Sequence, residues 1–142
     1  MILTPPAYHA PAQEAVDRGH FLSAQGQVES GLKLDAIGKK GELGPWQFTK
    51  ATWKAHMPGY DFATGATDPV LSALAARRRF DWIVGHLGTR GIPVTVENVS
   101  ACWLCGLSGG IRRILHGDLP EPAGRVANLY RAEMAVAPLK LD

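Results

Sequence analysis

Cysteine is scarce in this sequence: the 142 residues include two, Cys102 and Cys105, in the stretch ACWLCG. A zinc site would need two further ligands, and the five histidines show no HxxxH-type spacing. Thioredoxin-like chemistry requires a CxxC that follows a strand and begins a helix, whereas this CxxC lies inside an apolar run with a helical pattern. We therefore expect two small core residues, and neither a metal nor a cofactor.

Long hydrophobic runs are also lacking, and none approaches the roughly 20 apolar residues of a membrane-spanning helix. The N-terminus, MILTPPAYHAPAQEAVDR, has neither the basic nor the apolar region of a secretory signal. We therefore expect synthesis in the cytoplasm, so that action elsewhere would require export, release or injection. The net charge of +2 does not demand a nucleic-acid partner.

The length fits a single domain, which we assign to residues 1–142, with residues 1–11 as an extended N-terminal arm. Hydrophobic spacing is helical nearly throughout, so the expected class is mainly α, with about six helices. A glycine-rich segment, 32–48, is expected to form a loop or small hairpin, and 60–67 a loop. The expected helices are 13–30, 49–57, 68–89, 95–107, 110–116 and 121–137.

Four local signals mark helix boundaries. Gly31 is a plausible stop for the first helix. Thr49 and Thr95 are side chains that can cap a helix start. Asp68 followed by Pro69 is a strong start, because proline is favoured at the first helical position.

Glu29 is the candidate for acid–base chemistry. It stands at the end of a helix-like run among apolar neighbours, where the helix dipole and desolvation both raise the pKa of a carboxyl group. A raised pKa lets a general acid keep its proton near neutral pH. The alternative is that Glu29 is a solvated surface residue, and its position alone does not distinguish a catalytic acid from such a residue.

The pattern around Glu29 separates them. Glu29-Ser30-Gly31, Ala36-Ile37-Gly38, the run GELGPWQF (41–48) and Thr52-Trp53 follow in this order. They resemble the lysozyme-like superfamily, most closely its soluble lytic transglycosylase (SLT) domains. GPWQFTKATW is also similar to the resuscitation-promoting-factor branch. The likeness spans about Ala12 to Met134.

The resemblance implies a lytic transglycosylase that acts on peptidoglycan glycan strands. Glu29 would protonate the glycosidic oxygen between N-acetylmuramic acid and N-acetylglucosamine. It would then take a proton from the muramic C6 hydroxyl, leaving a 1,6-anhydro end. Gln47 and Ser30 would bind sugar amides, and Gly41 and Gly44 would let the backbone approach the glycan. Trp46, Phe48 and Trp103 would wall the cleft, or else pack in the core.

The later part of the motif departs from the family. Trp103 stands where the family has Tyr, Leu104 where it has Asn, and Arg125 where it has a second Tyr. These changes put substrate positioning in doubt, so a non-catalytic glycan-binding or structural protein with a lysozyme fold is one alternative. A muramidase-type hydrolase, such as an endolysin, is another. A hydrolase needs a second carboxylate, for which the candidates are Asp35, Glu42 and Asp61, with Asp61 favoured.

Two further features have competing interpretations. Residues 95–117 superficially resemble a helix-turn-helix with Arg112 and Arg113 on its second helix, but Gly109-Gly110 would weaken a recognition helix. We expect no nucleic acid. The run Arg77–Arg79 is expected to be a solvated helix face.

The lack of a secretory signal suggests a bacteriophage enzyme, released at lysis or carried in a virion, and a secretion-system or domesticated copy fits equally. The oligomeric state is left open.

Overall fold

A computed structural model describes residues 15–136, and the proposed N-terminal arm lies outside them. The described chain forms six helices and no strand, which confirms the mainly α class. Each of these helices is too short or too polar to cross a membrane. The helices are α1 Arg18–Ser30, α2 Lys50–His56, α3 Phe62–Gly65, α4 Pro69–Thr89, α5 Val96–Leu115 and α6 Glu121–Val136.

The predicted boundary signals act as expected. Thr49, Asp68 and Thr95 each accept a hydrogen bond from a backbone N–H in the first turn of their helices. Gly31 ends α1 in the left-handed region, with φ 70°. These signals work because each depends on a few neighbouring residues.

Three predictions about helices were wrong. The first helix begins at Arg18 rather than at residue 13, and Asp17 caps it. Residues 60–67 are not all loop, because Asp61 caps the four-residue helix α3 through bonds from the Thr64 backbone N–H and hydroxyl. The expected break between two helices in 95–116 is present, but it lies earlier than predicted. Two helical segments meet at Gly106 within α5, where φ is 76° and ψ is 166°. The kink falls at a glycine because few other residues adopt that conformation.

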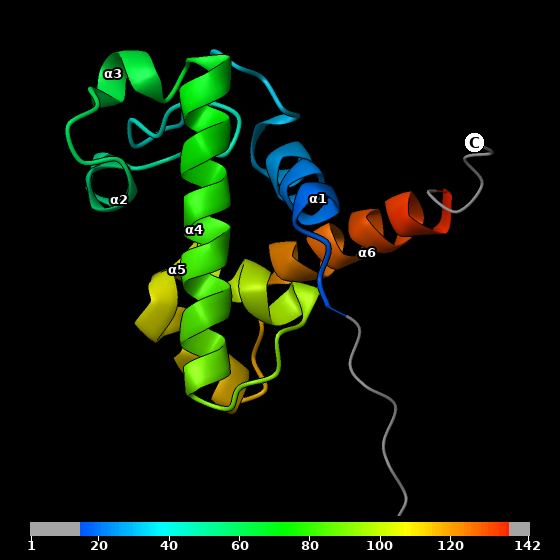
Figure 1. The fold of residues 1–142 in the computed structure, drawn as a ribbon. Coiled ribbons are helices and arrows are strands. Elements are labelled where there is room, and N and C mark those ends of the chain that lie inside the picture. The colour runs from blue at the N-terminus through cyan, green and yellow to red at the C-terminus, as the bar shows by residue number, and fades with distance from the viewer. Residues whose placement is uncertain (1–14, 137–142) are drawn as a thin grey trace, which may run out of the picture.

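The long helix α4 spans the molecule from end to end (Figure 1). It contacts α1, α2 and α5, while α6 packs on α1 and α5. A continuous line of aromatic contacts runs through the core, with ring centroids 5.3–6.2 Å apart. The rings belong to Phe80, Phe21, Trp103, Phe48 and Trp53. This core joins the helices to the glycine-rich loop through Phe48.

Candidate active site

The C-terminal end of α1, which carries Glu29, is fastened to the glycine-rich loop. The Ser30 hydroxyl donates a hydrogen bond to the Pro45 carbonyl at 2.8 Å. The Trp46 indole N–H donates to the Leu22 carbonyl, also at 2.8 Å. Both bonds join segments at least 15 residues apart. They hold Glu29 in a fixed position relative to the loop.

The loop itself is a tight, hairpin-like turn closed by isolated bridges at Ile37–Leu43 and Leu43–Phe48. Gln47 adopts a positive φ of 52°, and its side-chain NH2 donates to the Gly44 carbonyl at 2.9 Å. Gly44 also has a positive φ, of 81°, and a Cβ there would lie 1.9 Å from the Ala66 carbonyl oxygen. The structural reason for glycine at 44 is therefore close packing of the loop on the residue after α3.

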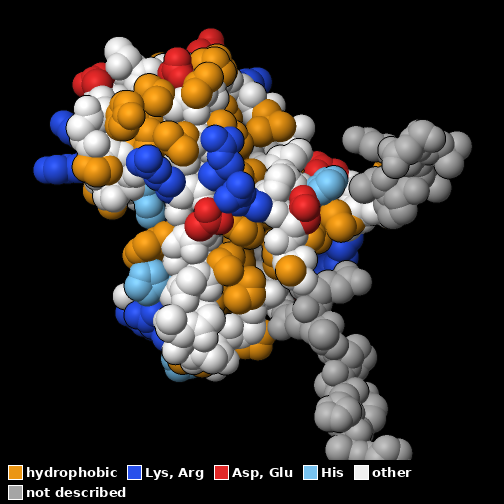
Figure 2. All heavy atoms as spheres, in the orientation of Figure 1, with side chains coloured by type: hydrophobic (Ala, Val, Ile, Leu, Met, Phe, Trp, Pro, Cys, Tyr) orange, Lys and Arg blue, Asp and Glu red, His pale blue; other side chains and the backbone are white. Residues whose placement is uncertain are grey.

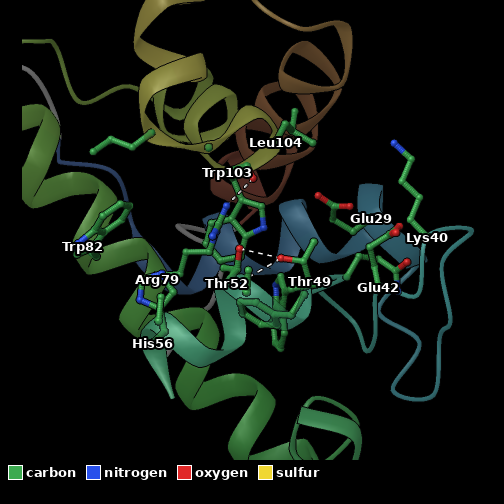
Figure 3. Close-up of a pocket in the computed structure, with 17 residues that line it drawn as sticks. Glu29, Lys40, Glu42, Thr49, Thr52, His56, Arg79, Trp82, Trp103 and Leu104 are labelled. Atoms are coloured by element: carbon green, nitrogen blue, oxygen red, sulfur yellow. Dashed lines mark hydrogen bonds between the residues drawn. The ribbon is translucent and has the colours of Figure 1, made fainter. Parts of the chain in front are cut away.

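A cavity of about 730 Å³ opens between this loop, α2, α4 and α5. In Figure 3, Glu29, Lys40 and Glu42 lie at one end of it, and Trp82 and His56 lie at the other. Trp103 and Leu104 of α5 lie between the two ends. The cavity therefore has one charged end that contains Glu29 and one aromatic end that does not.

The structure brings most of the predicted site residues together. Those that line the cavity are Glu29, Trp46, Gln47, Phe48 and Trp103. Ser30, Gly44 and Asp61 are not among its lining residues. Phe48 and Trp103 serve two purposes, since they are 2% and 5% exposed and also belong to the aromatic core. Their small exposed edges form part of the wall, while most of each ring packs inside.

Burial is the main influence on the Glu29 carboxyl and raises its pKa above the ordinary value of 4.5. A hydrogen bond from the Gln25 amide and the positive charge of Arg79 act in the opposite direction, while the charge of Glu42 raises the pKa further. A carboxyl group with a raised pKa keeps its proton at a higher pH, as a general acid must. The nearby amide and guanidinium would stabilise the carboxylate once the proton has left.

A buried polar chain behind Glu29 was missed by the sequence analysis. The Ser100 hydroxyl on α5 donates to the Gln25 side-chain oxygen at 2.8 Å, and the Gln25 NH2 donates to Glu29 Oε1 at 3.0 Å. Gln25 and Ser100 are both completely buried. Gln25 lies one turn before Glu29, which was a signal available in the sequence. Its link to Ser100, 75 residues away, was not.

Gln25→Met is expected to move the alkaline limb of the pH–activity profile to higher pH. The substitution keeps the side chain's approximate size but removes the donor that favours ionised Glu29, so the pKa of Glu29 rises. It also leaves the Ser100 hydroxyl without this partner, which costs up to about 1–3 kcal/mol of stability. Activity measured against pH, beside urea unfolding, separates the two effects.

Ser100→Ala is the matched control, because it removes the other half of the same chain and leaves the Gln25–Glu29 bond available. It should destabilise the fold to a similar degree while shifting the limb less. An unmoved limb in Gln25→Met would show that this amide does not influence the ionisation of Glu29.

Arg79 was also missed, because the run Arg77–Arg79 was predicted to be a solvated helix face. Arg77 and Arg78 are exposed, and acidic and basic side chains lie side by side on the face over α4 (Figure 2). For Arg79 the prediction was wrong. Its guanidinium lies 5.1 Å from the Trp103 ring centroid and donates to the Trp103 carbonyl at 2.7 Å. Burial lowers its pKa to about 10, so it is positively charged at neutral pH.

Of the three candidates for a second carboxylate, Glu42 lines the cavity with Glu29. One oxygen of Glu42, Oε1, is buried and has no hydrogen-bond partner among the described residues. Asp61 is occupied in capping α3, and Asp35 is exposed and absent from the lining. Of these three carboxylates, Glu42 is therefore the one that shares a cavity with Glu29.

Cys102 is a buried core residue, as predicted, and burial raises the pKa of its thiol to about 11. A thiol with such a pKa is unreactive at neutral pH. Cys105 is only partly buried, and both thiols are free. Within residues 15–136, no three His, Cys, Asp or Glu side chains are grouped so that they could hold a metal ion.

Comparison with known proteins agrees with this geometry. A family model described as the transglycosylase SLT domain matches residues 11–104, which is 94 of the 142 residues. The match includes Glu29, the glycine-rich loop and Trp103, and it ends at Leu104, short of the Met134 to which the resemblance was traced. Searches of curated proteins and of solved structures gave no match.

Proposed function

The chain belongs to the transglycosylase SLT domain family, and on that premise we propose that it cleaves the bond between N-acetylmuramic acid and N-acetylglucosamine in peptidoglycan. Membership in the family supports a glycan-cleaving activity of the lytic transglycosylase type. The observation that supports Glu29 as its acid is a partly buried carboxyl group of raised pKa at the wall of the cavity. No cofactor enters the proposed reaction.

In the proposed reaction, protonated Glu29 gives its proton to the glycosidic oxygen as the bond from that oxygen to the anomeric carbon breaks. The resulting carboxylate then takes the proton of the muramic C6 hydroxyl, whose oxygen bonds to the anomeric carbon. Glu29 is protonated again and no water is consumed. Gln25 and Arg79 would stabilise the carboxylate between the two steps, because an amide donor and a positive charge both favour ionisation.

Substrate contacts are proposed for the lining residues. The Gln47 NH2 is engaged by the Gly44 carbonyl, which leaves its oxygen to accept a hydrogen bond from a sugar amide. Leu104 lines the cavity where the family has Asn, so the proposed site has apolar surface in place of that amide. The test is incubation of purified peptidoglycan with the protein, in which release of soluble fragments supports the proposal and an intact polymer contradicts it.

A hydrolase is the second candidate, and the position of Glu42 favours it. Glycosidases that hydrolyse their substrate pair a general acid with a second carboxylate, and Glu42 lines the same cavity as Glu29. In that reaction Glu42 would take a proton from water while the water oxygen bonds to the anomeric carbon. The product would then carry a reducing end.

Glu42→Gln separates the two candidates. For a transglycosylase, we expect activity to remain within about tenfold of native, because Glu29 alone supplies the acid–base catalysis and the variant keeps its contribution of about 10²–10⁴-fold. The alkaline limb should move to lower pH, because the charge of Glu42 raises the pKa of Glu29. A loss as large as that of Glu29→Gln would instead identify Glu42 as a base and the protein as a hydrolase.

A further inference from the structure

The aromatic end of the cavity holds a tryptophan to which the proposed reaction gives no role. Trp82 on α4 is 42% exposed and lines the cavity that also contains Glu29. In Figure 3 it lies at the opposite end from Glu29, with Trp103, Thr49 and Thr52 between them. An isolated exposed aromatic on a protein surface is ordinary, but this one lines the same cavity as the candidate acid.

Two imidazole rings brace Trp82. His56 of α2 contacts the indole with centroids 5.5 Å apart and planes at 73°, and His86, one turn further along α4, does so at 4.5 Å and 63°. The His86 ring is itself held by the Arg90 guanidinium at 2.9 Å, and Arg78 donates to the backbone carbonyl of His56 at 3.0 Å. A ring fixed in this way loses little conformational freedom when a ligand stacks on it.

The surroundings of Trp82 suit a neutral ligand. Of the charged residues lining the cavity, Lys40 and Glu42 lie at the Glu29 end. Arg79, which lies near Trp82 in Figure 3, donates to the Trp103 carbonyl and contacts the Trp103 ring, while its buried Nε has no hydrogen-bond partner among the described residues. Burial and the neighbouring arginines lower the pKa of His56 to about 4, which leaves its ring uncharged at neutral pH.

On the α2 side, the wall between the two ends is made of small and hydroxyl-bearing side chains. Thr49 and Thr52 share a hydrogen bond of 3.0 Å, and Ala51 and Ala55 lie in the same wall. A pyranose ring offers an apolar C–H face for an indole and hydroxyls for threonines. A peptide stem bearing carboxylates would instead require an unengaged cation.

We infer that Trp82 is a stacking platform for a sugar ring of the glycan strand, in a subsite distant from the bond that Glu29 cleaves. This inference rests on the proposed function for its choice of polymer. The argument for this occupant is continuity, because a strand lying over Glu29 and extending along the cavity reaches Trp82. The platform would favour long strands over short ones.

The first test compares strand lengths. Trp82→Ala should lower kcat/KM about tenfold on long, peptide-free glycan strands, and leave it within about twofold on a tetrasaccharide that spans only the bond-cleaving end. Trp82→Phe should restore most of the loss. Tyr60→Ala is the matched control, because Tyr60 is 47% exposed and does not line the cavity. It should leave both substrates unaffected.

Three results would overturn the inference. They are an unchanged rate on long strands, an equal loss on long and short substrates, and a loss that occurs only when the strands carry their peptide stems. The last result would mean that Trp82 contacts the peptide stem and not a sugar ring.

A binding measurement keeps this inference separate from the proposed function. Trp82 is the most exposed of the four tryptophans, Trp53 and Trp103 being at most 5% exposed and Trp46 partly buried. Peptide-free glycan strands added to Glu29→Gln should therefore shield a large part of the fluorescence from quenching by acrylamide. The shielding should disappear in Glu29→Gln with Trp82→Ala. If glycan strands shield the fluorescence but the native protein does not cleave them, the proposed function is contradicted and the role of Trp82 is supported. If the native protein cleaves the strands but they give no shielding, the proposed function is supported and the role of Trp82 is contradicted.

Discussion

Replacing Glu29 by glutamine is expected to slow the release of soluble fragments from peptidoglycan by about 10²–10⁴-fold, the usual contribution of general acid–base catalysis. Glutamine has nearly the shape of glutamate and can accept the Gln25 hydrogen bond through its amide oxygen, but it has no proton to give to the glycosidic oxygen. The rate of turbidity loss of a peptidoglycan suspension measures this effect. A variant with more than a tenth of the native rate would exclude Glu29 as the acid.

Stability against pH is the control for this variant. Because burial raises the pKa of Glu29 in the folded protein, its contribution to stability is fully present below the ordinary value of 4.5. That contribution is lost as the pH rises through the raised folded-state value. Glu29→Gln does not ionise, so it should be at least as stable as the native protein at neutral pH. If Glu29→Gln were less stable than the native protein, its loss of activity would be explained by unfolding and not by the missing acid.

Gly44→Ala is expected to destabilise the protein by at least about 1–3 kcal/mol through overpacking, in addition to the strain of a positive φ. The added Cβ would lie 1.9 Å from the backbone oxygen of Ala66. A backbone atom cannot rotate away as a side chain can, so the loop and the end of α3 must separate. Urea unfolding followed by circular dichroism measures the change.

Gly41→Ala is the matched control for this prediction. Gly41 lies in the same loop with a similar φ of 84°, but a Cβ there meets no atom within 4 Å. It should show the strain of the positive φ alone, about 1–2 kcal/mol. Equal losses in the two variants would mean that close packing against Ala66 is not the reason for glycine at 44.

Features that depend on neighbouring residues were predictable from the sequence. The caps at Thr49, Asp68 and Thr95 and the stop at Gly31 each require a few adjacent side chains, and all four are confirmed. The loop motif was recognisable because its glycines and aromatics are close together in the chain. Helix α3 was missed because a single turn contains too few residues for a periodic pattern.

Features that depend on distant residues were not predictable. The side chain of Arg79 differs from its two neighbours only in the direction in which α4 presents it, toward Trp103 rather than solvent. The hydrogen bond from Ser100 to Gln25 joins α5 to α1, and the sequence of neither helix predicts a contact with the other. That Glu42 rather than Asp61 lines the cavity likewise follows from how the loop folds. In each case packing between distant segments placed the side chain, and packing is not visible in local spacing.

Mass spectrometry of the muropeptides released from purified peptidoglycan tests the central claim most directly. Fragments with 1,6-anhydro ends, one water lighter than hydrolysis products, should form with the native protein and be absent from digests with Glu29→Gln. Fragments with reducing ends, or anhydro fragments that persist in Glu29→Gln, would contradict the claim that this protein is a lytic transglycosylase working through Glu29.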